Sequence, residues 1–242
     1  MEKMSWEHHI SAVKSRMSRY IGVLYKLKHI LPLKARLLTF NSLVQSHVNF
    51  CSLVWGCAKK SKIETIFSTQ KKAMRAVMSG YVNYFYKDGK CPTHTKPGFT
   101  EHRTLTVQNI ILKNMLIFLN KVHNYQSSLP LSILNTISPD SPTPSFLPDY
   151  TSDWYKTHNC PPFNTSVFFK GPLLYSQIMT DNDTISNTNL HSYKRSIKSH
   201  LLTVQGSESS EEWSTNNFQL YCITGLRKSV RIKEQPAVNY QL

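Results

Sequence analysis

The stretch KIETIFSTQKKAMRAV, residues 62–77, places its apolar side chains three or four positions apart. In an α-helix this spacing puts them on one side. That side comprises Ile63, Ile66, Phe67, Gln70, Ala73, Met74 and Val77. Lys71, Lys72 and Arg75 fall on or beside the opposite side. The stretch therefore predicts an amphipathic helix with a basic outer face, and we expect Gln70 to pack inside the protein.

Two similar patterns precede this helix. Between residues 10 and 27 the apolar positions are Ile10, Val13, Met17, Ile21, Leu24 and Leu27. A second pattern runs through Leu37, Leu38, Val44, Val48 and Phe50 towards Trp55. Pro32 ends the first pattern and Gly56 the second, because both residue types interrupt helices. Three helices joined by short turns predict a small bundle, which we assign to residues 1–80.

Composition divides the remaining chain into four segments. They are a helical continuation (81–137), an irregular proline-rich connection (138–165), a closing strand-turn-helix element (166–205) and a flexible tail (206–242). Short strands are predicted at residues 166–169 and 218–223. The predicted fold class is mainly α, a small helical bundle followed by a helical and irregular C-terminal region with one or two short strands.

Two of these segments contain further helical patterns. Residues 80–102 are rich in Gly, Pro and Thr without an apolar period, which predicts a loop. An apolar helical pattern follows at residues 105–125. Residues 190–202 return to helical spacing and place Lys194, Arg195 and Lys198 outward.

Positive charge is concentrated near the start of the chain. Residues 1–80 contain fourteen Lys and Arg against Glu2, Glu7 and Glu64, and so carry +11 of the formal net charge of +15. Clustered Lys and Arg gain free energy by releasing counterions from a phosphate backbone. This charge favours nucleic acid as the partner, ahead of an anionic membrane surface.

Residue types for catalysis are scarce. Most metal-dependent phosphoryl transfer needs two or three carboxylates around divalent ions. Asp181 and Asp183 come closest to such a pair, but an Asn/Asp-rich turn explains them better. The short Cys/His pairs, Cys91 with His94 and His158 with Cys160, complete no zinc site. The single, scattered glycines form no phosphate-binding loop. The sequence therefore predicts no catalytic residue, metal ligand or cofactor in this chain.

Cysteine usage and hydropathy bear on the compartment. The five cysteines are odd in number and widely spread, and no secretory signal is recognisable, which is typical of a reducing environment. The longest apolar run, residues 110–119, is about half the length that a bilayer crossing needs. We expect an intracellular protein of the nucleus or cytoplasm, neither secreted nor bound to a membrane.

Short motifs in the N-terminal block occur in a characteristic order. They are Trp6-Glu7-His8-His9-Ile10, Lys14, Gly22-Val23-Leu24, Leu31-Pro32, Leu43-Val44-Gln45-Ser46-His47, Trp55-Gly56 and Gln70-Lys71-Lys72-Ala73-Met74-Arg75. This block resembles the region just downstream of the polymerase palm in reverse transcriptases of invertebrate non-LTR retrotransposons, the jockey-like group. Residues 168–175 with 193–198 resemble that family's closing element, although Tyr175-Ser176 and Tyr193-Lys194 stand where the family usually has Trp-Asn and Phe-Lys.

The resemblance covers most of residues 6–203 and implies part of an RNA-directed DNA polymerase. The family's catalytic aspartates, and the Mg²⁺ that they bind, belong to a palm upstream of the position matched by Trp6. No catalytic residue is therefore carried onto this chain. The resemblance implies a thumb and C-terminal segment, unable to polymerise alone, whose partners are the missing palm and an RNA or DNA template-primer duplex or target DNA.

A thumb grips its duplex through phosphate contacts, which agrees with the basic helix faces. The candidate contacts are Lys14, Arg16, Arg19, Lys26, Lys28, Lys71, Lys72 and Arg75. We expect them to act together as a surface. The aromatic residues Trp6, Tyr20, Tyr25 and Trp55 could stack on bases, but at helical positions such residues usually fill the core.

Alternatives of other classes remain open. The chain could be a non-enzymatic helical interaction module, or an inactive retroelement remnant, whose basic helices bind an acidic partner or nothing. A free-standing enzyme would need carboxylates or a nucleophile that the sequence does not offer.

Overall fold

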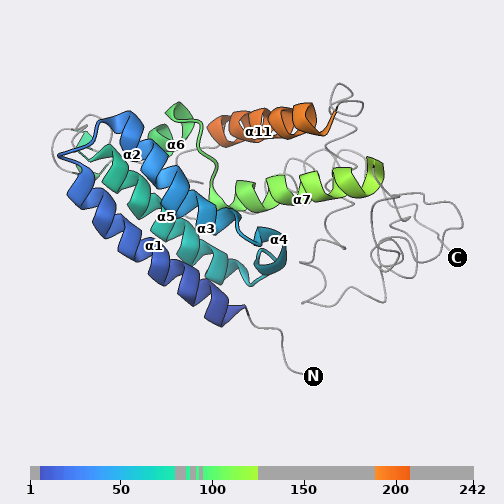
Figure 1. Cartoon of the computed structure of the whole chain (residues 1–242), viewed down its shortest axis with the longest axis horizontal. Coiled ribbons are helices and arrows are strands. Elements are labelled where there is room, and N and C mark those ends of the chain that lie inside the picture. The colour runs from blue at the N-terminus through green and yellow to red at the C-terminus, as the bar shows by residue number, and fades with distance from the viewer. Residues whose placement is uncertain (1–5, 80–85, 88–90, 93–94, 125–188, 208–242) are drawn as a thin grey trace, which may run out of the picture.

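The computed structural model describes residues 6–79, 86–87, 91–92, 95–124 and 189–207 (Figure 1). In this part the chain is mainly helical, which confirms the predicted fold class. Two short strands, β1 (Tyr86–Lys87) and β2 (Cys91–Pro92), pair antiparallel. The strands predicted at 166–169 and 218–223, the irregular connection and the tail lie outside the described residues, apart from the end of α11 at Ser207.

Three helical arms form a bundle in which the first and third run parallel. The arms are α1 (Glu7–Leu27), the bent arm of α2 (Leu33–Phe40), η1 (Asn41–Gln45) and α3 (Ser46–Asn49), and, after the short α4 (Ser52–Trp55), α5 (Lys60–Met78). Glu7 and Lys62, near the starts of α1 and α5, form an ion pair. Arg36, near the start of the second arm, donates Nη1 to the carbonyl of Ser79 at 2.8 Å. These contacts place the second arm antiparallel to the other two.

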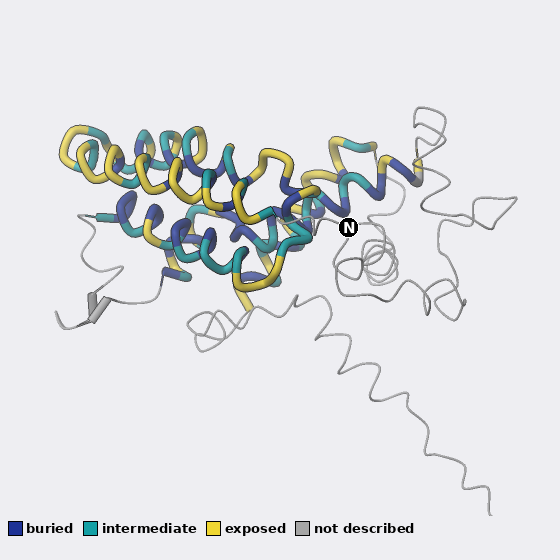
Figure 2. The backbone as a smooth tube through the Cα atoms, turned by 90° about the horizontal axis from the view of Figure 1, so that it is seen from below, coloured by how far each residue is buried: buried dark blue, intermediate teal, exposed yellow. Residues whose placement is uncertain are grey.

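The buried side chains of α1 and α5 follow the predicted helical stripes. They include Ile10, Val13, Met17 and Leu24 on α1 and Ile63, Ile66, Phe67, Ala73, Met74 and Val77 on α5. Gln70 is fully buried among them, as the sequence predicted. Figure 2 shows the buried stretches lining the inside of the bundle and the exposed ones its outside.

The sequence prediction was wrong about two apolar residues of the second arm. Leu38 and Phe50 are 64% and 66% exposed. The buried line of this arm is instead Arg36, Phe40, Val44 and Val48, spaced four residues apart as helix neighbours on one face are. Phe50 lies just past α3 and before Cys51, whose left-handed backbone (φ 48°) takes the chain out of helical register.

A helix interrupts the loop predicted at residues 80–102. α6 spans Lys96–Glu101 and has a proline in its first turn, where the missing N–H needs no partner. Phe99 of α6 is fully buried, and its ring centroid lies 6.5 Å from that of Phe67 on α5. Tertiary packing of Phe99 therefore stabilises a short helix in a segment that lacks a helical apolar period.

Two helices downstream of the bundle pack against each other, α7 (Val107–Asn124) and α11 (Leu190–Ser207) (Figure 1). The sequence predicted helices at both places. Tyr193, near the start of α11, donates its hydroxyl hydrogen to the carbonyl of Leu116 at 3.3 Å. Gln205, near the end of α11, accepts a hydrogen bond from the N–H of Thr106, which lies just before the start of α7. The pair is thus antiparallel, and its buried residues belong to the same hydrophobic core as those of the bundle.

Two buried glutamines fix the chain between α6 and α7. Gln45 and Gln70 both donate their side-chain amides to the carbonyl of Leu105, at 3.1 and 3.0 Å. Gln70 also donates to Oε1 of Gln45 at 3.0 Å and accepts the N–H of Val107 at 3.1 Å. The amide groups of the bundle thereby satisfy backbone groups of an extended segment that would otherwise be buried without partners.

Gln205 does the same from α11. Its amide donates to the carbonyl of Thr104 at 2.9 Å, and its Oε1 accepts the N–H of Thr106 at 3.1 Å. Gln205 is fully buried, like Gln70. These three residues, Gln45, Gln70 and Gln205, are called the glutamine cluster below. The cluster ties the second arm, α5 and α11 to a single extended stretch of three residues.

Two glycines give a matched test of this packing. At Gly22, exposed on α1, an added Cβ would have no neighbour within 4 Å among the described residues, so Gly22→Ala is expected to raise the free energy of unfolding by about 0.5–1 kcal/mol through helix propensity. At Gly56, an added Cβ would collide with the carbonyl oxygen of Ser52 and lie 2.6 Å from Cγ2 of Ile111 on α7. Gly56→Ala is expected to lower the free energy of unfolding by about 2–3 kcal/mol. Urea unfolding followed by circular dichroism measures both, and equal effects would contradict the close approach of α4 to α7.

Candidate nucleic-acid interface

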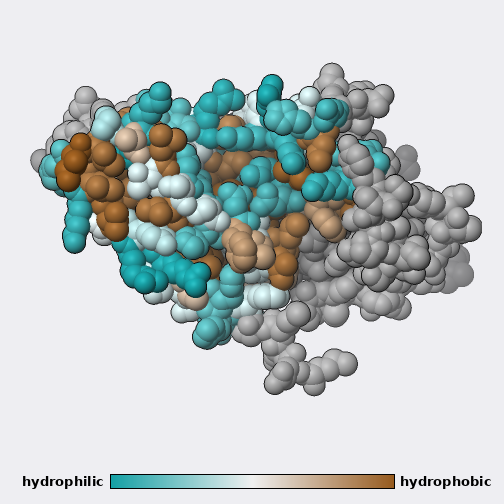
Figure 3. Space-filling view, viewed as in Figure 1, coloured by the Kyte–Doolittle hydropathy of each residue, from teal (hydrophilic) through white to brown (hydrophobic). Residues whose placement is uncertain are grey.

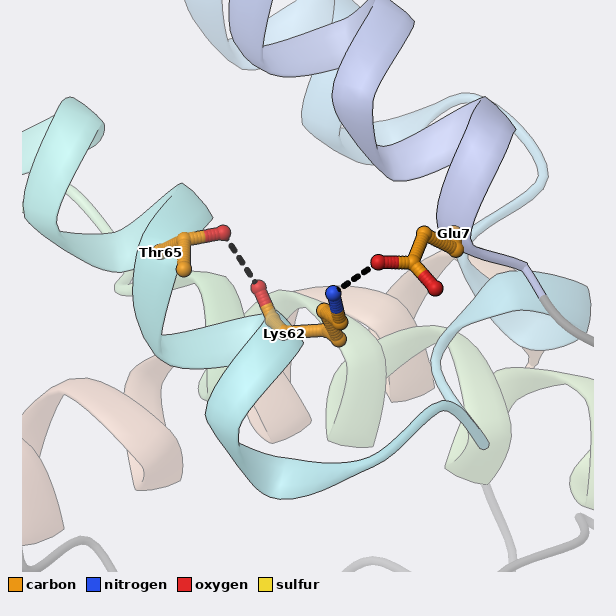
Figure 4. Close-up of polar contacts among 3 residues, drawn as sticks. All are labelled: Glu7, Lys62 and Thr65. Carbon is orange, nitrogen blue, oxygen red and sulfur yellow. Dashed lines mark hydrogen bonds and ion pairs between the residues drawn. The ribbon is translucent and has the colours of Figure 1, made fainter.

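The bundle has few carboxylates, and lysines outside the candidate set pair with them. Residues 6–79 contain Glu7 and Glu64 as their only acidic residues. Glu7 accepts a hydrogen bond from Nζ of Lys62, which lowers the pKa of the Glu7 carboxyl, and Figure 4 shows this pair joining α1 to α5. Glu64 lies 3.8 Å from Nζ of Lys60 one helical turn away. Neither pair involves one of the eight cations that the sequence proposed as phosphate contacts.

The five candidates near the N-terminus lie on or just beyond α1. Lys14, Arg16, Arg19 and Lys26 are exposed, whereas Lys28 is half-buried. The Nζ of Lys28 lies 6.0 Å from the ring centroid of Tyr25. Burial lowers the pKa of His47 on α3, and the charge of Arg16 lowers it further. Arg16 therefore lies on the side of α1 that faces the second arm.

Of the three α5 candidates, Lys71 and Arg75 lie close to each other. Nζ of Lys71 is 4.6 Å from the ring centroid of Phe67, whose neighbour Phe99 belongs to α6. Burial lowers the pKa of Lys71, and the positive charge of Arg75 one turn away lowers it further. Lys72 is exposed, and the buried Nε of the half-buried Arg75 has no hydrogen-bond partner among the described residues.

The structure thus divides the eight candidates into two groups. The α1 group is Lys14, Arg16, Arg19, Lys26 and Lys28, and the α5 group is Lys71, Lys72 and Arg75. On the face seen in Figure 3, hydrophilic side chains are widespread, and hydrophobic ones gather at the end of the bundle where α1 ends. Ile30, the most exposed of the large hydrophobic residues there, is 75% exposed.

The aromatic residues named as possible stacking partners are differently placed. Trp55 is 1% exposed and donates its indole N–H to the carbonyl of Phe50 at 2.8 Å, so it fills the core as expected. Trp6 is partly buried and packs against the core. Tyr20 stacks on the ring of His47 with 5.4 Å between centroids, and only Tyr25 is exposed. Base stacking therefore has one accessible candidate among these four.

The described residues bring together no metal site. No group of three or more His, Cys, Asp or Glu side chains in this part of the chain could hold a metal ion. Cys51 is an exposed free thiol, and Cys57 donates its thiol hydrogen to the carbonyl of Val54. The residues Asp181, Asp183, His94, His158 and Cys160, which the sequence singled out, lie outside the described residues.

A further pair of lysines escaped the sequence reasoning. Burial lowers the pKa of Lys113 on α7, and the charge of Lys198 on α11 lowers it further. The two residues are 85 positions apart, so helical periodicity cannot relate them. The sequence offered one indication of this pair, which is that neither α7 nor α11 contains an Asp or Glu to balance its lysines.

Comparisons with protein-family models, with curated proteins and with solved structures find no match to this chain. Of the described helices, none is both long and apolar enough to cross a membrane.

Proposed function

We propose that this chain binds duplex nucleic acid, including RNA–DNA hybrids, through phosphate contacts of its basic helices. In this proposal it is the post-palm part of a non-LTR retrotransposon reverse transcriptase and does not polymerise by itself. It acts inside the cell, in the nucleus or cytoplasm, together with a palm that supplies the catalytic aspartates and Mg²⁺.

The observation that carries the proposal is the proximity of two cations of the α5 group, Lys71 and Arg75. Lys71 and Arg75 are both half-buried. Arg75 lies close enough to Lys71 for its positive charge to lower the pKa of the Lys71 ammonium group. Like charges in this arrangement destabilise the free protein. A phosphate anion beside the two cations would offset their repulsion, because a nearby negative charge stabilises the protonated form of lysine.

The motif residues give the proposal its second support. Gln45 and Gln70, which belong to the motifs shared with the polymerase family, are both members of the glutamine cluster. Their role in this chain is to hold the bundle to the segment before α7. The neighbouring motif residues Lys71, Lys72 and Arg75 make none of the hydrogen bonds of the glutamine cluster, and Lys72 is exposed.

Binding to a fluorescein-labelled 20-base-pair RNA–DNA hybrid, followed by anisotropy, tests the proposal. If about four to six phosphates are contacted, Kd should rise roughly 100- to 1000-fold between ~50 and ~200 mM salt. A peptide nucleic acid duplex of the same sequence has the bases without the phosphates and should not bind. Absence of binding to the hybrid at ~50 mM salt would exclude the proposal and favour the interaction module.

A further inference from the structure

Two lysines on the antiparallel pair of α7 and α11 lie near each other. The Tyr193–Leu116 hydrogen bond sets the register of the pair. Counting back three residues from Leu116 reaches Lys113, and counting forward three to five from Tyr193 reaches residues 196–198. The bonds of Gln205 near the start of α7 fit the same register. Lys198 therefore lies opposite Lys113.

A polar side chain of α3 contacts Lys113. Its Nζ lies 3.4 Å from Oδ1 of Asn49 at the end of α3. The side-chain amide of Asn114 lies 3.4 Å from the same oxygen and donates to Oγ of Ser52 on α4 at 2.7 Å. An ammonium group has three N–H donors, and the contact with Asn49 uses one of them. Two donors of Lys113 remain for a ligand.

No carboxylate of the four helices meets these two cations. The sequences of α3, α4, α7 and α11 contain no Asp or Glu. Lys113 is half-buried, and its pKa is lowered by burial and by the charge of Lys198, which is exposed. Two cations whose charges interact, one of them partly desolvated, are stabilised by an anion that lies between them.

We propose that Lys113 and Lys198 together bind one phosphate group of a nucleic-acid backbone, at a second contact site outside the bundle. This inference rests on the proposed function, because it assumes that the chain meets a polynucleotide. It extends the contact surface from α1 and α5 to the α7–α11 pair. The ligand class is a phosphodiester, and the two lysines share one phosphate.

The test compares two double variants of the full chain. K113Q/K198Q removes the proposed site, and K34Q/K121Q removes two exposed lysines elsewhere as a charge-matched control. Loss of one shared phosphate contact should weaken hybrid binding by roughly tenfold near 100 mM salt and reduce the slope of log Kd against log salt by about 1. The control should keep the wild-type affinity and slope to within about twofold.

A second measurement does not depend on how the variants fold. Acetylation of each lysine in the wild-type chain is followed by mass spectrometry with and without the hybrid. Bound hybrid should reduce the labelling of Lys113 and Lys198 at least about threefold, while Lys34 and Lys121 keep theirs. Equal protection by ~10 mM inorganic phosphate alone would overturn the assignment to a polynucleotide.

The outcomes separate this inference from the proposed function. If the wild-type chain does not bind the hybrid at low salt, the proposed function fails and the site fails with it. If the wild-type chain binds, but K113Q/K198Q matches K34Q/K121Q and Lys113 stays unprotected, the second site is refuted while the proposed function stands.

Discussion

Replacement of Gln70 by alanine should lower the free energy of unfolding by about 3–5 kcal/mol, the largest loss of stability that we expect from one substitution at a polar residue. Gln70 is fully buried, and its amide serves Gln45, Leu105 and Val107. Without it, the N–H of Val107 and Oε1 of Gln45 lose their partners inside the core. Each such group costs about 1–3 kcal/mol when buried without a hydrogen bond. Urea unfolding followed by circular dichroism measures the change.

Gln108→Ala is the matched control for this prediction. Gln108, the second residue of α7, is only half-buried, and its buried Oε1 has no hydrogen-bond partner among the described residues. The same atoms are deleted, but no partner group is stranded, so the loss should stay below about 1 kcal/mol. Similar losses for both variants would contradict a structural role of the glutamine cluster.

Reversal of the α5 group in K71E/K72E/R75E should weaken binding to an RNA–DNA hybrid by at least about 100-fold near 50 mM salt. Three phosphate contacts are lost, and three new carboxylates repel the backbone. The salt dependence should fall at the same time, with the slope of log Kd against log salt reduced by about 2 to 3. Fluorescence anisotropy over a salt series measures both quantities.

The control for charge reversal is K34E/R103E/K121E, which changes the net charge by the same amount at three exposed residues. This variant should bind within about fivefold of wild type if position matters more than total charge. The neutral variant K71Q/K72Q/R75Q should fall between wild type and the reversal. If the control loses as much affinity as K71E/K72E/R75E, binding depends on net charge alone and the α5 group has no special part in it.

The helices of this protein were largely predictable because their apolar residues repeat at helical spacing. Helices α1, α5, α7 and α11 each begin within a few residues of the predicted position. The errors have local physical causes. Periodicity alone could not place Leu38 outside, because the buried line of the second arm includes Arg36, whose charged group bonds to the carbonyl of Ser79. α6 depends on the tertiary packing of Phe99, which no local pattern records.

The candidate site was predictable only in part. The basic faces of α1 and α5 could be read from charge and spacing, but their division into two groups depends on which helices lie beside them. The encounter of Lys113 with Lys198 requires the register of two helices far apart in the sequence. The glutamine cluster is of the same kind, since Gln70 and Leu105 are 35 positions apart and meet only in the folded chain.

The link between Gln205 and the segment before α7 has a consequence for synthesis on the ribosome. The two partners of this link are about 100 residues apart in the chain, so translation of α11 follows that of α7 by several seconds at ordinary elongation rates. During that interval Thr104, Thr106 and the side of α7 that contacts Tyr193 all lack their α11 partner. The nascent bundle can form first from local contacts. The α7 face is therefore the surface of the growing chain that a chaperone would meet before α11 arrives.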